Sequence, residues 1–395
     1  QSATYLILLV LSSSLAFSQN SNPELDSLLS KAIQNNKGIK AAQLQVDKSK
    51  ATIKTANTFD KTSIYYSYDQ NNRAPNDVAL RVFGAQQRFS FPTVYGAQKK
   101  VYTSEYEKEK ANFDIQKNKL SLAVSKSYQH IVYLQHQEKL YHYLDSLYQN
   151  FSKASDRRFE LGETNYLETI TAQAKFRQIR TKLSQIENDK KAQYEQLQSL
   201  LQTDEKIAIK SNSITPLVTF TEEMSKSFYT AYLESITKNY KNQINLQKQH
   251  WLPDINLEYF QGKNNGLSQS LHGFQVGLAI PILFSGNISK TKVAQLELQS
   301  WEQQKQNEEI KIEKYINQKK NELAKHQEAI NYYNLYGKKL SDEIIKAGNN
   351  SYKHGEIDFF QYIQSLENAT TIQVDYLDTI LQFNQTQLDL YYLNF

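Results

Sequence analysis

The sequence predicts a mainly helical protein with a smaller β component, built from a unit of helix, strand, strand, very long helix, turn and helix that occurs twice. Residues 93–215 and 282–395 contain no proline, which favours long helices because proline breaks a helix interior. Two regions alternate apolar and polar side chains with the period of a strand. Short motifs also recur in the second half of the chain, with an offset of 193 residues between Gly162 and Gly355.

The N-terminal end has the pattern of a targeting segment. Residues 5–17 are apolar or small, and a polar run follows them. This stretch is too short to span the ~30 Å hydrocarbon core of a bilayer as a helix. We therefore expect residues 1–18 to be a signal peptide, incomplete at its start because neither an initiator methionine nor a basic residue precedes the apolar stretch. The alternative is a buried N-terminal helix or strand.

The first repeat is predicted to comprise residues 19–209. Asn22 as a cap and Pro23 at the first helical position, followed by apolar residues at helical spacing, predict a helix over 23–59. Strand alternation follows at about 62–91. The region 96–203 is then predicted to hold a very long helix, a turn at Gly162 and a second helix.

The long helix carries a coiled-coil-like seam. Its apolar residues are spaced by three and four, which places them on one face of a helix. They are Val124, Tyr128 and Ile131, and further along Leu140, Leu144, Leu147 and Phe151. A packed partner helix along this face is therefore expected.

The second half repeats the same order after a linker at 210–221. Residues 222–395 are predicted to form the second repeat, with a helix at 222–250, strands at about 254–282 and helices at 287–395 interrupted by a turn at Gly355. Direct matches support the duplication. Phe159, Gly162, Glu163, Tyr166 and Ile170 correspond to Tyr352, Gly355, Glu356, Phe359 and Ile363.

The four predicted strands have the length of membrane strands, which need about 9–11 residues when tilted. Four strands alone leave two open edges, which lipid does not tolerate because the N–H and C=O groups of the edges would stay unpaired. Closure into a barrel therefore requires several chains, and two copies would supply about 8 strands while three would supply about 12. The alternative is the core of a soluble β-sandwich, whose strands alternate in the same way.

Several kinds of chemistry find no support in the sequence. There is no cysteine, which excludes disulfides, thiolate metal sites and lipid attachment to an N-terminal cysteine. No phosphate-binding loop, dinucleotide fingerprint or hydrolase motif is present. His130, His136 and His142 are spaced by six residues, which scatters them around a helix. We expect no enzymatic activity and no catalytic, cofactor or metal site, and the net charge of +5 gives little support to nucleic-acid binding.

These features resemble the TolC family of outer-membrane efflux proteins over nearly the whole predicted mature chain. The resemblance rests on the paired strands, on the stretches at 91–96, 252–255 and 280–286, and on the turns at 159–162 and 352–355. Residues 91–100 (FPTVYGAQKK) and the short length look most similar to CzcC/CusC-like channels of heavy-metal efflux systems. The resemblance implies a homotrimer with a 12-stranded outer-membrane β-barrel, continued by long coiled-coil-like periplasmic helices.

The resemblance also implies a location and partners. The protein would lie in the outer membrane of a Gram-negative bacterium, with a long periplasmic extension. It would be a passive channel of a tripartite efflux system, working with a periplasmic adaptor (membrane-fusion) protein and an inner-membrane RND transporter. The implied cargo is heavy-metal cations of the Cu/Ag or Co/Zn/Cd type. Drug or small-molecule efflux and protein secretion are alternative functions for the same fold. An alternative from a different functional class is an exported coiled-coil scaffold or adaptor without a pore.

The same resemblance assigns site residues. In the family, the two helix turns form the periplasmic tip, where adaptor helices dock and the aperture narrows. Transferred by motif, the tip residues are Leu161, Gly162, Glu163, Thr164, His354, Gly355, Glu356 and Ile357. The candidates for the pore constriction are Glu168, Thr171, Gln361 and Gln364. Family members commonly carry acidic residues at the positions of Gln361 and Gln364, so this chain departs from an all-carboxylate constriction.

Overall fold

The protein was analysed as a computed structural model that describes residues 22–73, 79–211, 213–217, 223–263, 269–282 and 284–392. The predicted signal peptide and parts of the predicted linker, residue 212 and residues 218–221, lie outside the described residues. The chain divides into two compact units. Unit 1 draws on Gln1–Asn36, Leu120–Phe220 and Glu322–Leu388, and unit 2 on Lys37–Lys119, Thr221–Asn321 and Asp389–Phe395. Each unit thus combines segments of both predicted repeats.

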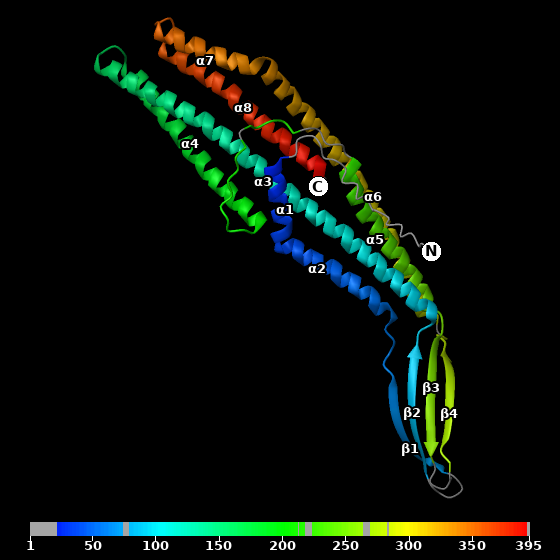
Figure 1. Cartoon of the computed structure of the whole chain (residues 1–395). Helices are drawn as coiled ribbons and strands as arrows, with labels where there is room; N and C mark the ends of the chain where they lie inside the picture. The colour runs from blue at the N-terminus through cyan, green and yellow to red at the C-terminus, as the bar shows by residue number, and fades with distance from the viewer. Residues whose placement is uncertain are drawn as a thin grey trace, which may run out of the picture. The chain divides into compact units, whose positions relative to one another are not determined.

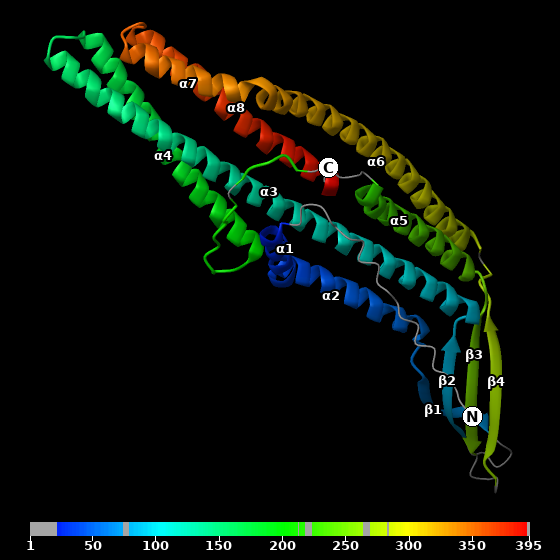
Figure 2. The same ribbon diagram turned by 45° about the horizontal axis from the view of Figure 1, so that its top comes forward.

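Unit 2 contains one antiparallel sheet of four strands. The strands are β1 (Ser63–Arg73), β2 (Ala79–Phe89), β3 (Asp254–Lys263) and β4 (Leu271–Ala279). They lie in the order β1-β2-β3-β4, as Figure 2 shows. The central pair, β2 and β3, joins the two repeats, with Ala85 opposite Tyr259. All four strands lie within the two ranges that the sequence predicts, and β1 and β4 form the edges.

The register separates the strand residues into two different faces. One face, called the apolar face below, carries nine large side chains that are all more than two-fifths exposed. They are Ile64, Tyr66, Tyr68, Phe83, Leu257, Tyr259, Phe274, Val276 and Leu278. The opposite face, called the polar face, carries Ser63, Ser67, Gln86, Arg88, Asp254, Asn256, Glu258 and Gln275, together with the apolar or aromatic residues Tyr65, Leu80, Val82, Phe260 and Leu271. The apolar face also includes the polar residues Arg81, Gln87, Gln261, Lys263 and His272. The alternation that predicts the strands therefore produces one surface rich in large exposed apolar side chains and one mixed surface.

The helices of unit 2 are α2 (Lys37–Thr52), the 3₁₀ turn η1 (Ile53–Asn57), α5 (Glu223–Gln249) and the first parts of α3 (Pro92–Glu160) and α6 (Ser285–Tyr332). α3 begins at Pro92, although the sequence places its start at Gly96. Proline is tolerated in the first turn because the N–H groups there have no partner within the helix. Val94, Ala97 and Leu246 form the buried contact between α3 and α5.

The secondary structure of the described part of unit 1 is helical. Besides the remaining parts of α3 and α6, it contains α1 (Pro23–Asn35), α4 (Tyr166–Leu201), the π-helical segment η2 (Tyr333–Gly337), α7 (Lys338–Lys353) and α8 (Phe359–Tyr392). Figure 1 shows α4 running alongside α3, and α8 alongside α7. None of the described helices is long and apolar enough to cross a membrane.

The predicted seam of α3 lies in two hydrophobic cores of unit 1. Val124, Tyr128 and Ile131 are buried against Leu28 of α1 and Leu197 of α4. Further along, Leu144 and Phe151 are buried in a core that includes residues of α4 and α8, with Leu140 and Leu147 packed against it. The predicted helix–helix packing along α3 is therefore confirmed.

Two helical regions differ from the sequence-based expectation. The predicted helix 23–59 is divided at Asn36, whose ψ of 118° leaves the helical region and whose Nδ2 donates to the carbonyl of Leu200, 3.3 Å away. The second helical run, expected to break only at Gly355, also contains η2. There Tyr333 stacks on Tyr376 of α8, with ring centroids 3.6 Å apart. Neither break is marked by a proline, the signal on which the prediction of long helices depends.

Candidate functional site

The turn between α3 and α4 is built around Gly162. Its φ is +74°, in the left-handed region that side chains with a Cβ disfavour. The amide of Gly162 donates to the carbonyl of Phe159 at 2.9 Å, and the amide of Glu163 donates to that of Arg158 at 2.8 Å. This pair of bonds is the Schellman ending of a helix, which satisfies the last free carbonyls.

The turn between α7 and α8 has the same geometry at the predicted offset. Gly355 has a φ of +73°. Its amide donates to the carbonyl of Tyr352 at 3.2 Å, and the amide of Glu356 donates to that of Ser351 at 2.8 Å. The turns predicted at Gly162 and Gly355 are therefore confirmed, and the duplication extends to individual backbone hydrogen bonds.

The helices that follow the turns begin with equivalent caps. Asn165 accepts a hydrogen bond through Oδ1 from the amide of Glu168 at 2.9 Å, and Asp358 accepts one from the amide of Gln361 at 2.8 Å. In the second turn, Gln361 Oε1 also accepts from the amide of Asp358 at 3.0 Å, which completes a capping box. Glu168 and Gln361 thus lie in the first turns of their helices, and Gln361 stabilises the start of α8 directly.

The side chain of Glu168, unlike that of Gln361, accepts its hydrogen bonds from other side chains. It is buried, and its Oε2 accepts from the hydroxyl of Thr164 at 2.5 Å. Its Oε1 lies 3.4 Å from Nη1 of Arg158 and accepts from the hydroxyl of Tyr352 at 3.3 Å. Arg158 Nη1 also donates to that hydroxyl at 2.9 Å. The carboxylate therefore has three partners, one of which belongs to the other repeat.

The contact among Arg158, Glu168 and Tyr352 joins the two helix pairs of unit 1. Burial raises the pKa of the Tyr352 hydroxyl, and the Glu168 carboxylate raises it further, while Arg158 acts in the opposite direction. The hydroxyl therefore stays protonated and can donate to Glu168. Beneath it, the ring of Tyr352 stacks on Tyr362 with centroids 4.8 Å apart. Sequence reasoning missed this contact, although Tyr352 differs from its counterpart Phe159 only by the hydroxyl that makes it.

The first turn exposes an apolar surface. Leu161 is 66% exposed, Tyr166 64% and Leu167 57%, and Phe159 and Ile170 are exposed beside them. At the second turn, the large exposed apolar side chain is Phe360, and its neighbours Lys353, His354 and Glu356 are polar. The two turns thus share a backbone and differ in the surface that they present.

The remaining predicted residues have local roles in the described structure. His354 Nδ1 lies 2.8 Å from the carbonyl of Asn350, and Glu356 accepts from the hydroxyl of Ser351 at 2.8 Å. Ile357 packs against the core below the turns. Gln364 is exposed and donates to Asn368 at 3.1 Å, and Thr171 is half-buried. The structure therefore brings all twelve predicted residues to the two turns and the helix starts that follow them.

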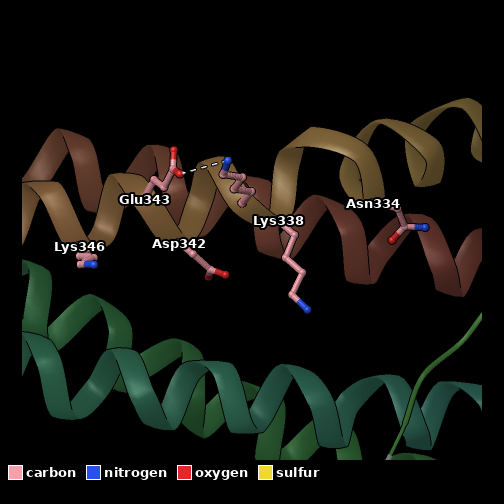
Figure 3. A pocket seen from close by; sticks show the side chains of 6 residues that line it. Asn334, Lys338, Asp342, Glu343 and Lys346 are labelled. Atoms are coloured by element: carbon pink, nitrogen blue, oxygen red, sulfur yellow. Dashed lines mark ion pairs between the residues drawn. The ribbon is translucent and has the colours of Figure 1, made fainter.

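A pocket also lies on η2 and α7. It is lined by Asn334, Lys338, Lys339, Asp342, Glu343 and Lys346. Figure 3 shows its side chains and the ion pair in which Lys339 Nζ lies 3.7 Å from Glu343 Oε1. Because both partners are largely exposed and the lining carries charges of both signs, the pocket favours neither an anionic nor a cationic ligand.

Neither a protein-family model nor a curated protein sequence matches the chain. Solved structures do. The chain is similar to a membrane protein from Pseudomonas aeruginosa, with 14% identity, 93% of each chain covered and a TM-score of 0.79. It is similar to CusC, with 16% identity, 95% of this chain and 94% of that chain covered, and a TM-score of 0.77. It is also similar to the outer membrane protein VceC from Vibrio cholerae, with 14% identity, 94% and 95% covered, and a TM-score of 0.76.

These similarities define the class of fold. The chain has the fold of the TolC-type outer-membrane channels, in which a small antiparallel sheet accompanies long helices, as the sequence resemblance predicts. CusC is among the similar structures, and so are the channels OprN and CmeC, with TM-scores of 0.79 and 0.73.

Proposed function

We propose that this chain is one protomer of a homotrimeric channel in the outer membrane of a Gram-negative bacterium. The observation that carries the proposal is the apolar face of the sheet. Nine large side chains of that face are exposed, and the opposite face carries charged residues such as Arg88, Asp254 and Glu258 beside its apolar ones. A membrane barrel has an apolar surface towards lipid and a polar interior. A soluble sandwich would instead need a second apolar layer to cover this face.

The edges of the sheet support a trimer. β1 and β4 each pair with a neighbour on one side only, and lipid does not tolerate the unpaired groups of such an edge. Pairing β4 of one copy with β1 of the next would satisfy both edges. Three copies would give about 12 strands, a wider barrel than the ~8-stranded barrel whose interior side chains fill. A passive conduit through the outer membrane follows from this arrangement.

We assign the two turns as the place where a periplasmic adaptor protein docks and connects the channel to an inner-membrane RND transporter. The exposed apolar residues at the first turn, Leu161, Tyr166 and Leu167, offer an unusually apolar surface for a helix end. Among the candidates for the pore constriction, Gln364 is exposed and Thr171 is half-buried. We favour these two over Glu168 and Gln361, whose side chains form hydrogen bonds with neighbouring residues.

Heavy-metal cations of the Cu/Ag or Co/Zn/Cd type are our assignment of the cargo. It is supported by the resemblance of residues 91–100 to CzcC/CusC-like channels and by the similarity to CusC. Similar structures of comparable TM-score include VceC and OprN, so drug or small-molecule efflux is the alternative that the test must separate. Protein secretion through the same fold is a further alternative.

Two experiments test the proposal. Cell fractionation followed by purification should find the protein in the outer membrane, dependent on detergent and trimeric, and the purified protein should conduct ions in a planar bilayer. A soluble monomer would refute the channel proposal and favour an exported coiled-coil scaffold. Deleting the gene should lower tolerance to Cu, Ag, Zn, Cd or Co. Unchanged metal tolerance with new sensitivity to dyes and detergents would replace the metal cargo by organic compounds.

A further inference from the structure

A group of metal-ligating side chains lies between α3 and α4, away from the turns. Glu138 and His142 are four residues apart on α3, which places them on one face of the helix. Glu187 comes from α4. The ligand atoms of the three side chains all lie within 4.8 Å of one another, with His142 exposed and both glutamates half-buried. The sequence alone does not suggest this group, because Glu187 is far from the other two along the chain.

We propose that Glu138, His142 and Glu187 form a binding site for a divalent transition-metal cation of the Zn²⁺ class. One imidazole and two carboxylates suit Zn²⁺ and its neighbours Co²⁺ and Ni²⁺, whereas Mg²⁺ and Ca²⁺ prefer oxygen ligands throughout. Ligands of a tetrahedral Zn²⁺ ion lie ~3.3 Å apart, given bond lengths of ~2.0–2.1 Å. The half-buried and exposed side chains can close the remaining distance by changing rotamer. Water would complete the coordination.

Lys190 shows that this group already holds a cation. Its Nζ lies 2.5 Å from both carboxylate oxygens of Glu138. With the imidazole neutral, the two carboxylates and the one ammonium leave a formal charge of minus one at the site. A divalent cation would displace the ammonium from Glu138 and neutralise both carboxylates. Lys190 is therefore the competitor of the metal, and its removal should tighten metal binding.

The second helix pair indicates that packing does not require this polar group. At the offset of 193 residues that relates Gly162 to Gly355, Glu187 corresponds to Ile380 and Lys190 to Phe383. Both residues are buried together with Ile330 in an apolar core of unit 1. A helix pair of this fold is therefore stable with apolar side chains at this level. At the same offset Glu138 and His142 correspond to Asn331 and Leu335, so the set of two glutamates and one histidine is not repeated in the second pair.

The metal would act as a clamp between α3 and α4. A ligand that binds the folded chain alone stabilises it by mass action, so Zn²⁺ should raise the unfolding temperature. The inference does not depend on the proposed channel function or its cargo, because the site lies within unit 1 of a single chain. A protein that binds Zn²⁺ here and fails to conduct ions would leave the inference intact.

The test uses the full chain purified in detergent. Zn²⁺ affinity is measured by competition with a chromogenic chelator, and Co²⁺ is bound in parallel for its visible absorption spectrum. The variants are His142→Gln and Glu187→Gln, which remove ligands, Lys190→Met, which removes the competitor, and Glu195→Gln as a control on an exposed part of α4. Far-UV circular dichroism verifies that each variant is folded.

The expected result is a loss of at least about tenfold in Zn²⁺ affinity for both ligand variants, equivalent to ~1.4 kcal/mol. The control should keep the wild-type affinity, and the Lys190 variant should bind more tightly. The Co²⁺ spectrum should change when His142 is replaced, which a merely structural role would not produce. A wild-type chain that binds no Zn²⁺, equal affinity in all variants, or weaker binding by Lys190→Met would overturn the assignment.

Discussion

Replacing Val276 by lysine tests whether the apolar face meets lipid. Val276 lies on β4, is 61% exposed and is flanked on the same face by Phe274 and Leu278. Its neighbour Gln275 points to the polar face opposite Glu258. The substitutions Val276→Lys and Gln275→Lys therefore introduce the same charge one residue apart, on opposite faces of one strand.

The magnitude follows from the position of Val276 along the strand. Exposed Ile280 continues the apolar surface beyond the end of β4. Four residues at ~3.4 Å each, tilted by ~40°, place Val276 ~10 Å inside that edge, close to the middle of a ~25 Å band. A lysine near the midplane costs ~2–4 kcal/mol in each chain, or ~6–12 kcal/mol in a trimer. Lysine at position 275 should cost little, because it would face water and Glu258.

The assay compares the amount of folded trimer in the outer-membrane fraction for the two variants and for the wild type. Val276→Lys should reduce it severely, and Gln275→Lys should leave it nearly unchanged. Since the two variants carry the same net charge, charge alone cannot produce a difference. Equal levels of both variants, or a greater loss for Gln275→Lys, would refute the assignment of the apolar face to lipid.

Three further predictions concern local stability. Gly355→Ala should destabilise the second turn by ~1–2 kcal/mol, because Gly355 has a φ of +73°. Gly96→Ala in the interior of α3 should instead stabilise the chain by ~0.5–1 kcal/mol, and thermal unfolding of both variants tests the difference. Tyr352→Phe should cost ~1–2 kcal/mol in the same assay by removing a hydroxyl bound to two charged groups, and the exposed Tyr166→Phe should cost nearly nothing. Burial lowers the pKa of His130 in the folded chain. Below pH ~6.5 the unfolded chain therefore binds more protons than the folded chain, and the free energy of unfolding decreases as the pH is lowered. Between pH ~8 and ~5, the unfolding temperature of His130→Gln should decrease less steeply than that of the wild type.

The sequence reveals the strands and the turns because each rests on a local rule. Alternation with period two identifies the strand ranges, and the positions of Gly162 and Gly355 identify the left-handed turns. The break at Asn36 and the π segment at Tyr333–Gly337 have no comparable signal. Asn36 is held by the carbonyl of Leu200 and Tyr333 by the ring of Tyr376, so both depend on partners distant in sequence.

The predicted site residues lie at the two turns and at the helix starts that follow them, and their roles in docking and constriction stay predictions. The motif places Glu168 and Gln361 correctly at the starts of the two helices after the turns. It does not reveal the partners of their side chains, because a repeat pattern contains no information about contacts between repeats. Gln361 closes a capping box, and Glu168 binds Arg158 and Tyr352. The same limit applies to the Zn²⁺ site, where one ligand comes from a different helix.

Divergence between the repeats explains why the polar contact near the turns occurs once. Arg158, Glu168 and Tyr352 meet at one point, and at the offset of 193 residues between Gly162 and Gly355 their counterparts are Ser351, Gln361 and Phe159. None of these three can take the same part, because Phe159 lacks the hydroxyl, Ser351 carries no charge and Gln361 is used in its own cap. Each member of the contact thus differs from its counterpart by the group that makes it. The backbone of the turns was kept in both repeats, while three side-chain differences made the polar contact among Arg158, Glu168 and Tyr352 possible at one place near the turns.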